Sequence, residues 1–405
     1  MDREQWHFLL SEEGQRLLAE KAETPISSQN HLQIASRLRN QIDPHLAQAV
    51  VETVWLRQRA GDKFSKADEM YFTRAALEQS SSETISSYRA RRFFEGGFKQ
   101  IADLGCGIGG DSLALSAHAK VTGIDMDRMR LSMARENVRV YGYGERFLPV
   151  QADLTQLPPT AVEALFFDPA RRDEHGKRLK SVHLYQPPLR LINTWLARTP
   201  HAAVKISPGI NYAEIPPDVD VEFISVNGDV KECVFWYGDL RRRVDRQATL
   251  LPEEHTLTSA AHAGAELQPR EPGAYLYEPD GAVIRAHLVQ NLARQIGAAP
   301  IEATIAYLTS DEPLETPFAR RFALEDWFPF QLKRLRQYLR ERKIGRVTIK
   351  KRGSPLDPDI LQRQLRLQGD EERIIFLTYV LDTAAVLIGR DDQVMQQETR
   401  AQIAR

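Results

Sequence analysis

The sequence has little cysteine, little net charge and no long apolar run. Its 405 residues include only two cysteines, Cys106 and Cys233. Two are too few for a disulfide framework or a four-ligand zinc site, so we expect no metal centre. The formal net charge is -1, which excludes a polycationic chain. Any nucleic-acid binding must therefore come from a local basic patch.

The absence of long apolar runs bears on localisation. No stretch approaches the roughly 18 consecutive apolar residues of a membrane span. The first twenty residues carry acidic side chains early and lack the apolar run of a signal peptide. We expect a cytoplasmic, soluble protein with no membrane partner. The sequence favours no particular oligomeric state.

Four segments differ in their hydrophobic pattern. Residues 1–97 space apolar side chains three and four apart, which predicts a helical region. Residues 98–247 alternate short apolar strands with amphipathic helices, a pattern typical of an α/β domain with a mostly parallel sheet. Residues 248–272 lack strong periodicity and are expected to form a connector. Residues 273–405 again mix strands and helices, which predicts a separate C-terminal domain.

The α/β segment is expected to end in a hairpin. Two apolar runs within residues 221–240 flank Asn227, Gly228 and Asp229. These residue types favour the tight turn between two antiparallel strands. The hairpin therefore adds one antiparallel strand to the predicted sheet.

A glycine-rich stretch, "DLGCGIGGD" from Asp103 to Asp111, follows a predicted strand and opens a helix. Glycines at 105, 107, 109 and 110 allow a tight turn and the close approach of a ligand to the backbone. The start of the next helix offers free N–H groups. Asp103 precedes the glycines, which suits a ligand with a positive charge better than a pyrophosphate. A nicotinamide-binding domain, the alternative for such a loop, is disfavoured by Asp103 and by the hairpin.

Two further acids end the next two predicted strands. Asp125 lies about twenty residues after the loop, where a carboxylate holds ribose hydroxyls in nucleotide-binding sheets. Asp153 ends the strand that follows. Three acids at successive strand ends match a ligand that combines a cationic amino acid portion, a ribose and an adenine.

This constellation resembles the class I S-adenosylmethionine-dependent methyltransferases. The resemblance implies a Rossmann-like, mostly parallel seven-stranded sheet with a terminal antiparallel hairpin, and S-adenosyl-L-methionine as cofactor. In that family the glycine loop contacts the methionine portion, and the next two acids meet the ribose and the adenine. Carried over by position, the cofactor-binding residues are Asp103, Gly105, Cys106, Gly107, Gly109, Asp125, Met126, Asp153 and Leu154. Within this set Cys106 is interpreted as a small residue that fits the loop.

The stretch "FFDPARR", Phe166 to Arg172, ends the fourth predicted strand. It resembles the segment with which related enzymes hold an exocyclic amine of a base: an acid or amide, two prolines and a stacking aromatic. We therefore assign catalytic roles to Asp168, Pro169, Ala170 and Arg171. The acid and the first proline match, whereas alanine and arginine replace the second proline and the aromatic. Arg171 and Arg172 are candidates for stacking on a base or for gripping a phosphate or carboxylate.

The order of motifs is similar to a bacterial group of class I methyltransferases with a C-terminal α+β THUMP-like domain. THUMP domains bind RNA, so the resemblance implies an RNA substrate such as rRNA or tRNA. Residues 333–352 carry ten lysines and arginines against one acid, Glu341. This tract fits either a solvated helix face or a set of phosphate contacts, with Lys350, Lys351 and Arg352 as candidate substrate-binding residues.

Two alternatives stay open at this point. The enzyme could methylate a small anionic metabolite or a protein side chain, with the two arginines after Pro169 holding the anionic group. A third class is a non-catalytic RNA-binding factor that retains cofactor binding. The intact series of three strand-end acids argues against this last alternative.

Overall fold

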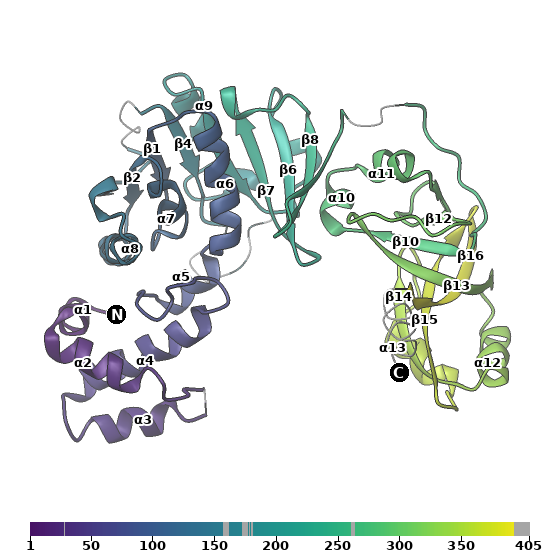
Figure 1. The fold of residues 1–405 in the computed structure, drawn as a ribbon, viewed down its shortest axis with the longest axis horizontal. Helices are drawn as coiled ribbons and strands as arrows, with labels where there is room; N and C mark the ends of the chain where they lie inside the picture. The colour runs from purple at the N-terminus through teal and green to yellow at the C-terminus, as the bar shows by residue number, and fades with distance from the viewer. Residues whose placement is uncertain are drawn as a thin grey trace, which may run out of the picture. The chain divides into compact units, whose positions relative to one another are not determined.

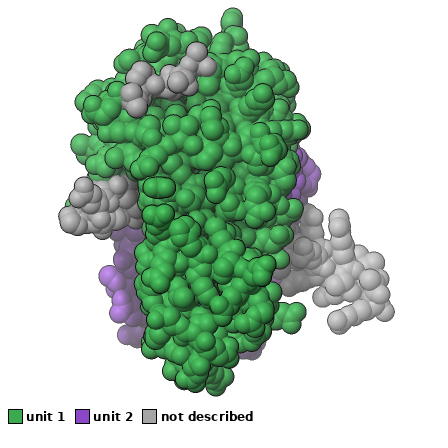
Figure 2. Space-filling view, turned by 90° about the vertical axis from the view of Figure 1, so that its left-hand side faces the viewer, with its two compact units in different colours: residues 1–220, 233–243 green, residues 221–232, 244–405 purple. Residues whose placement is uncertain are grey.

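The chain divides into two compact units, which the computed structural model describes for residues 1–27, 29–156, 162–171, 177, 179, 181–260 and 264–392. One unit comprises residues 1–220 and 233–243, and the other comprises residues 221–232 and 244–405 (Figure 2). The four segments expected from the sequence were defined by their hydrophobic pattern, whereas these units are defined by spatial contacts. The limits of the four segments therefore stay predictions.

The first 95 residues form six helices, as the apolar spacing predicts. Several of them begin at a side chain that caps the free N–H groups of the first turn. Asp2 accepts a hydrogen bond from the Gln5 amide (3.0 Å), and Asp43 caps a helix that starts with Pro44. The helices are α1 (Arg3–Leu10), α2 (Glu12–Lys21), α3 (His31–Leu38), α4 (Pro44–Ala60), α5 (Arg74–Gln79) and α6 (Glu83–Glu95).

A nine-stranded sheet follows, with the order β3-β2-β1-β4-β5-β7-β6-β8-β9. Strands β1 to β5 pair in parallel, and β7 pairs antiparallel to β5. The first seven strands in this order confirm the expected sheet with its terminal hairpin. The strands are β1 (Gln100–Leu104), β2 (Lys120–Asp125), β3 (Phe147–Gln151), β4 (Ala164–Phe167), β5 (Ala202–Ile206), β6 (Asp220–Val226), β7 (Asp229–Tyr237), β8 (Arg246–Leu251) and β9 (His255–Thr258).

Strands β8 and β9 fall mostly within residues 248–272, where the sequence predicts a connector. Ala248, Leu251 and Leu257 are buried, whereas polar residues occupy positions between them. Each strand is too short to give a clear two-residue periodicity, which explains why the pattern was missed. The predicted hairpin turn is present: Asn227 (φ 51°) and Gly228 (φ 85°) adopt the two left-handed conformations of a type I′ turn.

Four helices accompany this sheet: α7 (Gly110–Ser116), α8 (Arg128–Val140), α9 (Leu191–Leu196) and the preceding α6. The Asp127 carboxylate starts α8 by accepting from the Met129 and Arg130 amides (2.8 and 3.1 Å). Helix α6 packs beside α7 (Figure 1). The helical region thus reaches the element that follows the glycine loop.

The C-terminal part contains a second sheet, with the order β11-β12-β10-β13-β16-β15-β14. Among the strand pairs of this sheet in the described residues, only the edge pair β14–β15 is parallel, so this is the expected α+β domain. Its strands are β10 (Tyr275–Pro279), β11 (Ala299–Pro300), β12 (Leu308–Ser310), β13 (Ala319–Pro329), β14 (Ile344–Lys351), β15 (Glu371–Val380) and β16 (Thr383–Asp391); its helices are α10 (Gly281–Arg285), α11 (Val289–Ile296), α12 (Leu332–Glu341) and α13 (Pro358–Leu365).

Helices α12 and α13 bury one face each against this sheet. Leu335 and Leu339 of α12 and Leu361 and Leu365 of α13 share a core with Ile375 of β15. The opposite face of α12 carries its basic residues. In the part of the chain that the structure describes, no helix is long and apolar enough to span a bilayer.

Candidate functional site

The glycine loop between β1 and α7 folds back over the end of β2. The Gly105 and Cys106 amides both donate to the Ile124 carbonyl (2.8 and 3.0 Å). Gly105 has φ 82°, and a Cβ built on it would lie 2.9 Å from the backbone carbonyl oxygen of Asp168. Glycine is therefore required at position 105 for two reasons: its backbone conformation and its close contact with the end of β4.

Two more glycines of the loop adopt positive φ. A Cβ built on Gly107 (φ 56°) would have no atom within 4 Å, whereas a Cβ on Gly109 (φ 85°) would lie 3.2 Å from Ala134 in α8. Gly109 also caps α7, whose first amides face the loop. The loop thus offers bare backbone on one side and packs against a helix on the other.

Asp125 lies at the end of β2, as predicted. One carboxylate oxygen accepts from the Gly107 amide and the other from the Asp127 amide, both at 2.9 Å. Each oxygen keeps a further lone pair, and the side chain is half-buried. This geometry fits a bidentate hold on two vicinal hydroxyls. The next residue, Met126, is 64% exposed and presents a large apolar side chain beside that carboxylate.

Asp153 follows β3 and is also half-buried. Its Oδ1 accepts from the hydroxyl and from the amide of Thr155 (2.7 and 2.8 Å). These hydrogen bonds, from the hydroxyl first, lower the pKa of Asp153 below its usual value. The neighbouring Leu154 is buried. The ionised Asp153 carboxylate could accept a hydrogen bond from the amino group at the edge of an adenine. The apolar Leu154 could pack against the face of the ring.

Asp103 differs from the other two acids because it is only 1% exposed. Its Oδ2 accepts from the Ser112 hydroxyl (2.5 Å). Its Oδ1 is buried and has no hydrogen-bond partner among the described residues. Burial, followed by the charge of Asp111, raises the pKa of Asp103 well above its usual value. An unsatisfied buried carboxylate oxygen fits the ammonium of an amino acid portion.

Cys106 packs inside the loop and is buried. Burial is the main cause that raises the pKa of its thiol, and the charges of Asp103 and Asp125 add to it. The thiol is therefore kept protonated, which agrees with a packing role.

The loop that begins at Asp168 follows β4 directly. The Asp168 amide donates to the Leu104 carbonyl (3.2 Å), which fixes the end of β4 to β1. Ala170 exchanges two backbone hydrogen bonds with Gln186 (2.7 and 3.1 Å). Pro169 is buried, Ala170 is exposed and Arg171 is half-buried. The structure therefore holds this loop at both ends, while Arg172 lies outside the described residues.

Lys205 of β5 is a site residue that the sequence analysis did not identify. It is 3% exposed, and its ammonium lies 2.6 Å from Asp168 Oδ2 and 3.0 Å from the Ser81 hydroxyl. Ser81 in turn accepts from Arg89 and donates to Asp111, which Arg89 also binds. A lysine within the apolar strand "AAVKI" was the available signal, because strands buried on both faces rarely contain one.

The basic residues of β14 form contacts within the C-terminal domain. Lys350 and Arg352 both bind the Glu278 carboxylate, the latter at 3.6 Å. Lys350 also lies over the Phe322 ring and Arg352 over the Tyr307 ring. Lys351 donates to the Leu356 carbonyl (3.2 Å). The substrate-binding role of these three residues stays a prediction.

Exposed cations are found instead on α12. Lys333 and Arg340 lie two helical turns apart, and Lys343 follows the helix. Within the described residues their side chains make no ion pair or hydrogen bond. Arg336 differs, since it donates to the Gln364 carbonyl (2.7 Å).

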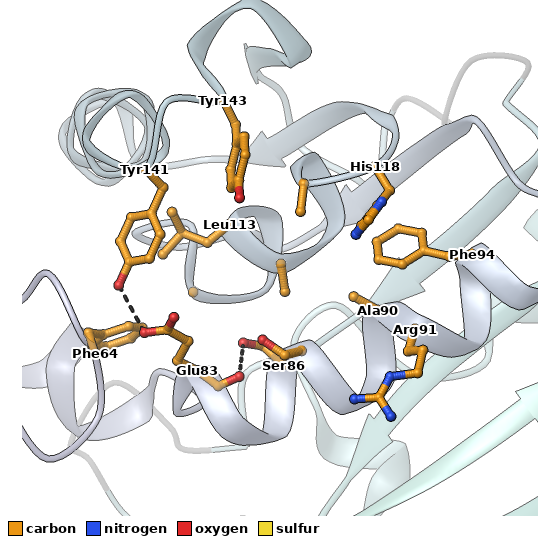
Figure 3. A pocket seen from close by; sticks show the side chains of 14 residues that line it. Phe64, Glu83, Ser86, Ala90, Arg91, Phe94, Leu113, His118, Tyr141 and Tyr143 are labelled. Atoms are coloured by element: carbon orange, nitrogen blue, oxygen red, sulfur yellow. Dashed lines mark hydrogen bonds between the residues drawn. The ribbon is translucent and has the colours of Figure 1, made fainter.

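A cavity of about 250 Å³ lies between α6 and α7 (Figure 3). At one end the Tyr141 hydroxyl donates to the Glu83 carboxylate (3.0 Å), and at the other Phe94 packs on His118. It contains none of the predicted site residues. Its lining residues are Phe64, Glu83, Ser86, Ser87, Ala90, Arg91, Phe94, Gly110, Leu113, Ala114, Ala117, His118, Tyr141 and Tyr143.

The described residues contain no group of three metal-binding side chains. The groups at this edge of the sheet are carboxylates, backbone amides and one lysine. These groups converge because the carboxyl ends of parallel strands lie at one edge of a sheet. The sheet order, the glycine loop and the strand-end acids together define a Rossmann-like methyltransferase domain.

Comparison with known proteins agrees with this class. A methyltransferase domain model matches residues 101–168, a THUMP domain-like model matches residues 319–391, and a domain of unknown function matches residues 2–60. The chain is 32% identical over 347 residues to an uncharacterized S-adenosylmethionine-dependent methyltransferase of Mycobacterium tuberculosis, covering 82% of this chain and 92% of the relative. The chain therefore belongs to the S-adenosylmethionine-dependent methyltransferases, and S-adenosylmethionine is its cofactor.

A solved structure extends the likeness to the whole fold. The crystal structure of a putative methyltransferase from Porphyromonas gingivalis W83 has a TM-score of 0.74 and 22% identity. The match covers 93% of this chain and 98% of that one. Thus the same fold recurs in a distant sequence.

Proposed function

We propose that this methyltransferase acts on RNA and transfers the methyl group to an exocyclic amine of a base. The Asp168 carboxylate carries the proposal. It lies at the end of β4, beside the glycine loop, with one oxygen bound to Lys205. Its other oxygen, Oδ1, receives no hydrogen bond from the described residues. That oxygen is available for an N–H group of the acceptor.

The chemistry required of the chain is alignment. Bound S-adenosylmethionine supplies an electrophilic methyl group on a sulfonium and leaves as S-adenosylhomocysteine. We propose that Asp168 Oδ1 and the Pro169 carbonyl accept the two N–H bonds of the amine. This orientation turns the nitrogen lone pair toward the methyl group for in-line displacement. The nitrogen then releases one proton, which the carboxylate can accept before it passes to solvent.

The proposed cofactor-binding residues lie at the same edge of the first sheet, where the parallel strands end. We propose that Asp103 and the backbone of Gly105 and Gly107 hold the methionine portion, with Cys106 and Gly109 shaping the loop. Asp125 and Met126 would hold the ribose, and Asp153 and Leu154 the adenine. The unsatisfied Asp103 Oδ1 and the remaining lone pairs of Asp125 support this assignment.

An RNA acceptor is supported by the THUMP domain-like match and by α12. We propose that Lys333, Arg340 and Lys343 bind phosphates, because no group in the described residues holds these exposed cations. Lys350, Lys351 and Arg352 contribute to the same positive tract but are held by their own domain. Arg171, next to the acceptor-holding residues, would contact the base or an adjacent phosphate.

The proposal is tested by incubating the protein with methyl-labelled cofactor and total RNA from a strain that lacks the gene. We expect label in one RNA class, and nucleoside mass spectrometry then identifies the modified base. The Asp168→Ala variant, which removes the accepting oxygen, should lose about 100-fold or more in transfer while retaining cofactor affinity in calorimetry. Asp229→Ala, at an exposed hairpin, is the matched control and should be as active as wild type.

Two outcomes would contradict the proposal. Label in protein or small molecules and in no RNA class would move the acceptor to a protein side chain or an anionic metabolite, with Arg171 holding its anionic group. Full activity of Asp168→Ala would remove Asp168 from the acceptor site while leaving the RNA substrate intact.

A further inference from the structure

A buried network connects the acceptor-holding carboxylate to the helix that follows the cofactor loop. It begins at Asp168 Oδ2, which binds Lys205 (2.6 Å). Lys205 also donates to the Ser81 hydroxyl (3.0 Å). Ser81 donates to Asp111 in the first turn of α7 (3.2 Å), and Arg89 of α6 binds both Ser81 and Asp111. Four segments distant in sequence therefore meet through one set of polar contacts.

The burial of this network shows that it is not a surface feature. The side chain of Lys205 is 4% exposed and that of Arg89 is 2% exposed, whereas that of Asp168 is 22% exposed. Burial of a lysine carries a large desolvation cost, and a buried ion pair often stabilises a fold no more than apolar residues of similar size would. The other residues of β5, Ala202, Ala203, Val204 and Ile206, are apolar. Packing alone therefore does not account for a lysine at position 205.

The contacts of Lys205 leave Asp168 with a defined orientation. Lys205 holds only Oδ2, so this oxygen is kept in place while Oδ1 stays available. Ser81 has its hydroxyl fully used: it accepts from Lys205 and Arg89 and donates to Asp111. It therefore cannot rotate without breaking a hydrogen bond, and this fixes the position of the Lys205 ammonium.

We infer that Lys205 is a positioning residue for methyl transfer. It holds Asp168 in the orientation that receives the acceptor amine, and through Ser81 and Asp111 it sets the distance between the acceptor site and the cofactor loop. The inference rests on the proposed role of Asp168. It also gives the N-terminal segment a part in the reaction, since Ser81 precedes α6 and Arg89 belongs to it.

The test measures kcat for RNA methylation and the cofactor Kd for four variants: Lys205→Met, Lys205→Arg, Asp168→Ala and the double variant Lys205→Met/Asp168→Ala. Lys205→Met should lower kcat about 100-fold, as expected for a misplaced reacting group, with cofactor Kd within about twofold of wild type. Lys205→Arg keeps the charge and should recover at least about tenfold of the loss. The double variant should be no slower than Asp168→Ala, because both changes remove the same interaction.

Lys231 provides the control, since it is an exposed lysine that also pairs with an aspartate, Asp229. Lys231→Met should leave kcat unchanged. If Lys205→Met fails to fold, the arginine and double variants still decide, because neither leaves an unpaired buried carboxylate. A Lys205→Met kcat within about twofold of wild type, or losses that multiply in the double variant, would overturn the inference.

A structural measurement separates this inference from the proposed function. If wild type methylates no RNA, the RNA proposal fails, and crystal structures of wild type and Lys205→Met with S-adenosylhomocysteine decide the role of Lys205. The inference expects the Asp168 carboxylate to turn away from its wild-type orientation while the loop from Gly105 to Gly109 is unchanged. An unmoved carboxylate refutes it.

Discussion

The charged residues at the edge of the first sheet and those on α12 differ in how they are held. At the sheet edge, Lys205 binds Asp168 and Arg89 binds Asp111, with little solvent access. On and after α12, Lys333, Arg340 and Lys343 are exposed, and no group in the described residues binds their side chains. One region fixes its charges in space and the other leaves them free to move.

This difference matches two kinds of recognition. Methyl transfer requires the reacting groups to lie within about 0.5 Å of their productive positions. The carboxylate that orients the acceptor must therefore be held by rigid neighbours. Binding to a polyanion gains mainly from counterion release and tolerates flexible cations. Under the proposed function, the two regions would therefore separate the chemistry from the attraction of substrate. Variants of one should leave the function of the other intact.

Reversing the charge of the basic residues on and after α12 should have the largest effect, because it should weaken RNA binding without changing the sheet edge. The triple variant Lys333→Glu/Arg340→Glu/Lys343→Glu should lower RNA affinity on the order of 100-fold at low salt. Removal of three phosphate contacts should also reduce the slope of log affinity against log salt by about 2 to 3. Filter binding across a salt series measures both quantities.

The control for this variant compares single changes. Arg363 is an exposed arginine of α13 in the same domain. Arg363→Glu should affect RNA affinity less than Arg340→Glu. Cofactor affinity, measured by calorimetry, should be the same in all of them. If the triple variant binds RNA as wild type does, the basic face of α12 is only a solvated surface.

A second comparison tests how tightly the sheet edge is built. Gly105→Ala places a methyl group 2.9 Å from the Asp168 carbonyl at a positive φ, whereas Gly97 (φ 80°) has no atom within 4 Å of its Cβ position. Both alanines carry the backbone strain, and only the first adds the clash. We expect Gly105→Ala to be less stable than Gly97→Ala by about 1–3 kcal/mol. Urea unfolding measures the difference.

The catalytic consequence distinguishes the two glycines further. Gly105→Ala should reduce methyl transfer because it displaces the loop and the end of β4 together. Gly97→Ala lies before β1 and should keep full activity. Equal stability and activity of the two variants would show that Gly105 does not need its close contact with Asp168.

Much of the sheet edge could be predicted from sequence, because parallel strands bring their carboxyl ends together. Asp103, Asp125, Asp153 and Asp168 were identified in this way. The network around Lys205 could not be, since Lys205 lies 124 residues from Ser81 in the chain. One lysine in an apolar strand signals a buried charge without indicating its partner.

The C-terminal domain was harder to predict for a related reason. The sequence places ten cations in one tract, but only the fold shows that Lys350 and Arg352 bind Glu278. The eleven-residue strand β13 lacks a regular alternation, because a bulge between Leu324 and Asp326 interrupts it. The helical segment after β10 is divided into α10 and α11 near His287, which has φ 58°.

The smallest expected effect concerns Asp103, whose buried Oδ1 has no hydrogen-bond partner among the described residues. Burial raises its pKa, so in the free protein it holds its proton to higher pH than an ordinary aspartate. An ammonium placed beside Oδ1 favours the ionised form. Cofactor binding should therefore release a fraction of one proton. Affinity should increase with pH up to the raised pKa of the free protein and then level off.

Calorimetry in two buffers with different ionisation enthalpies measures this proton release. Asp103→Asn should abolish it, because an amide has no proton to lose in this range. Asp125→Asn serves as the control, since its carboxylate accepts two amide hydrogen bonds and is proposed to bind neutral hydroxyls. It should weaken cofactor binding and leave the release unchanged. Equal release by wild type and Asp103→Asn would mean that Asp103 does not face the ammonium and supports the loop only through Ser112.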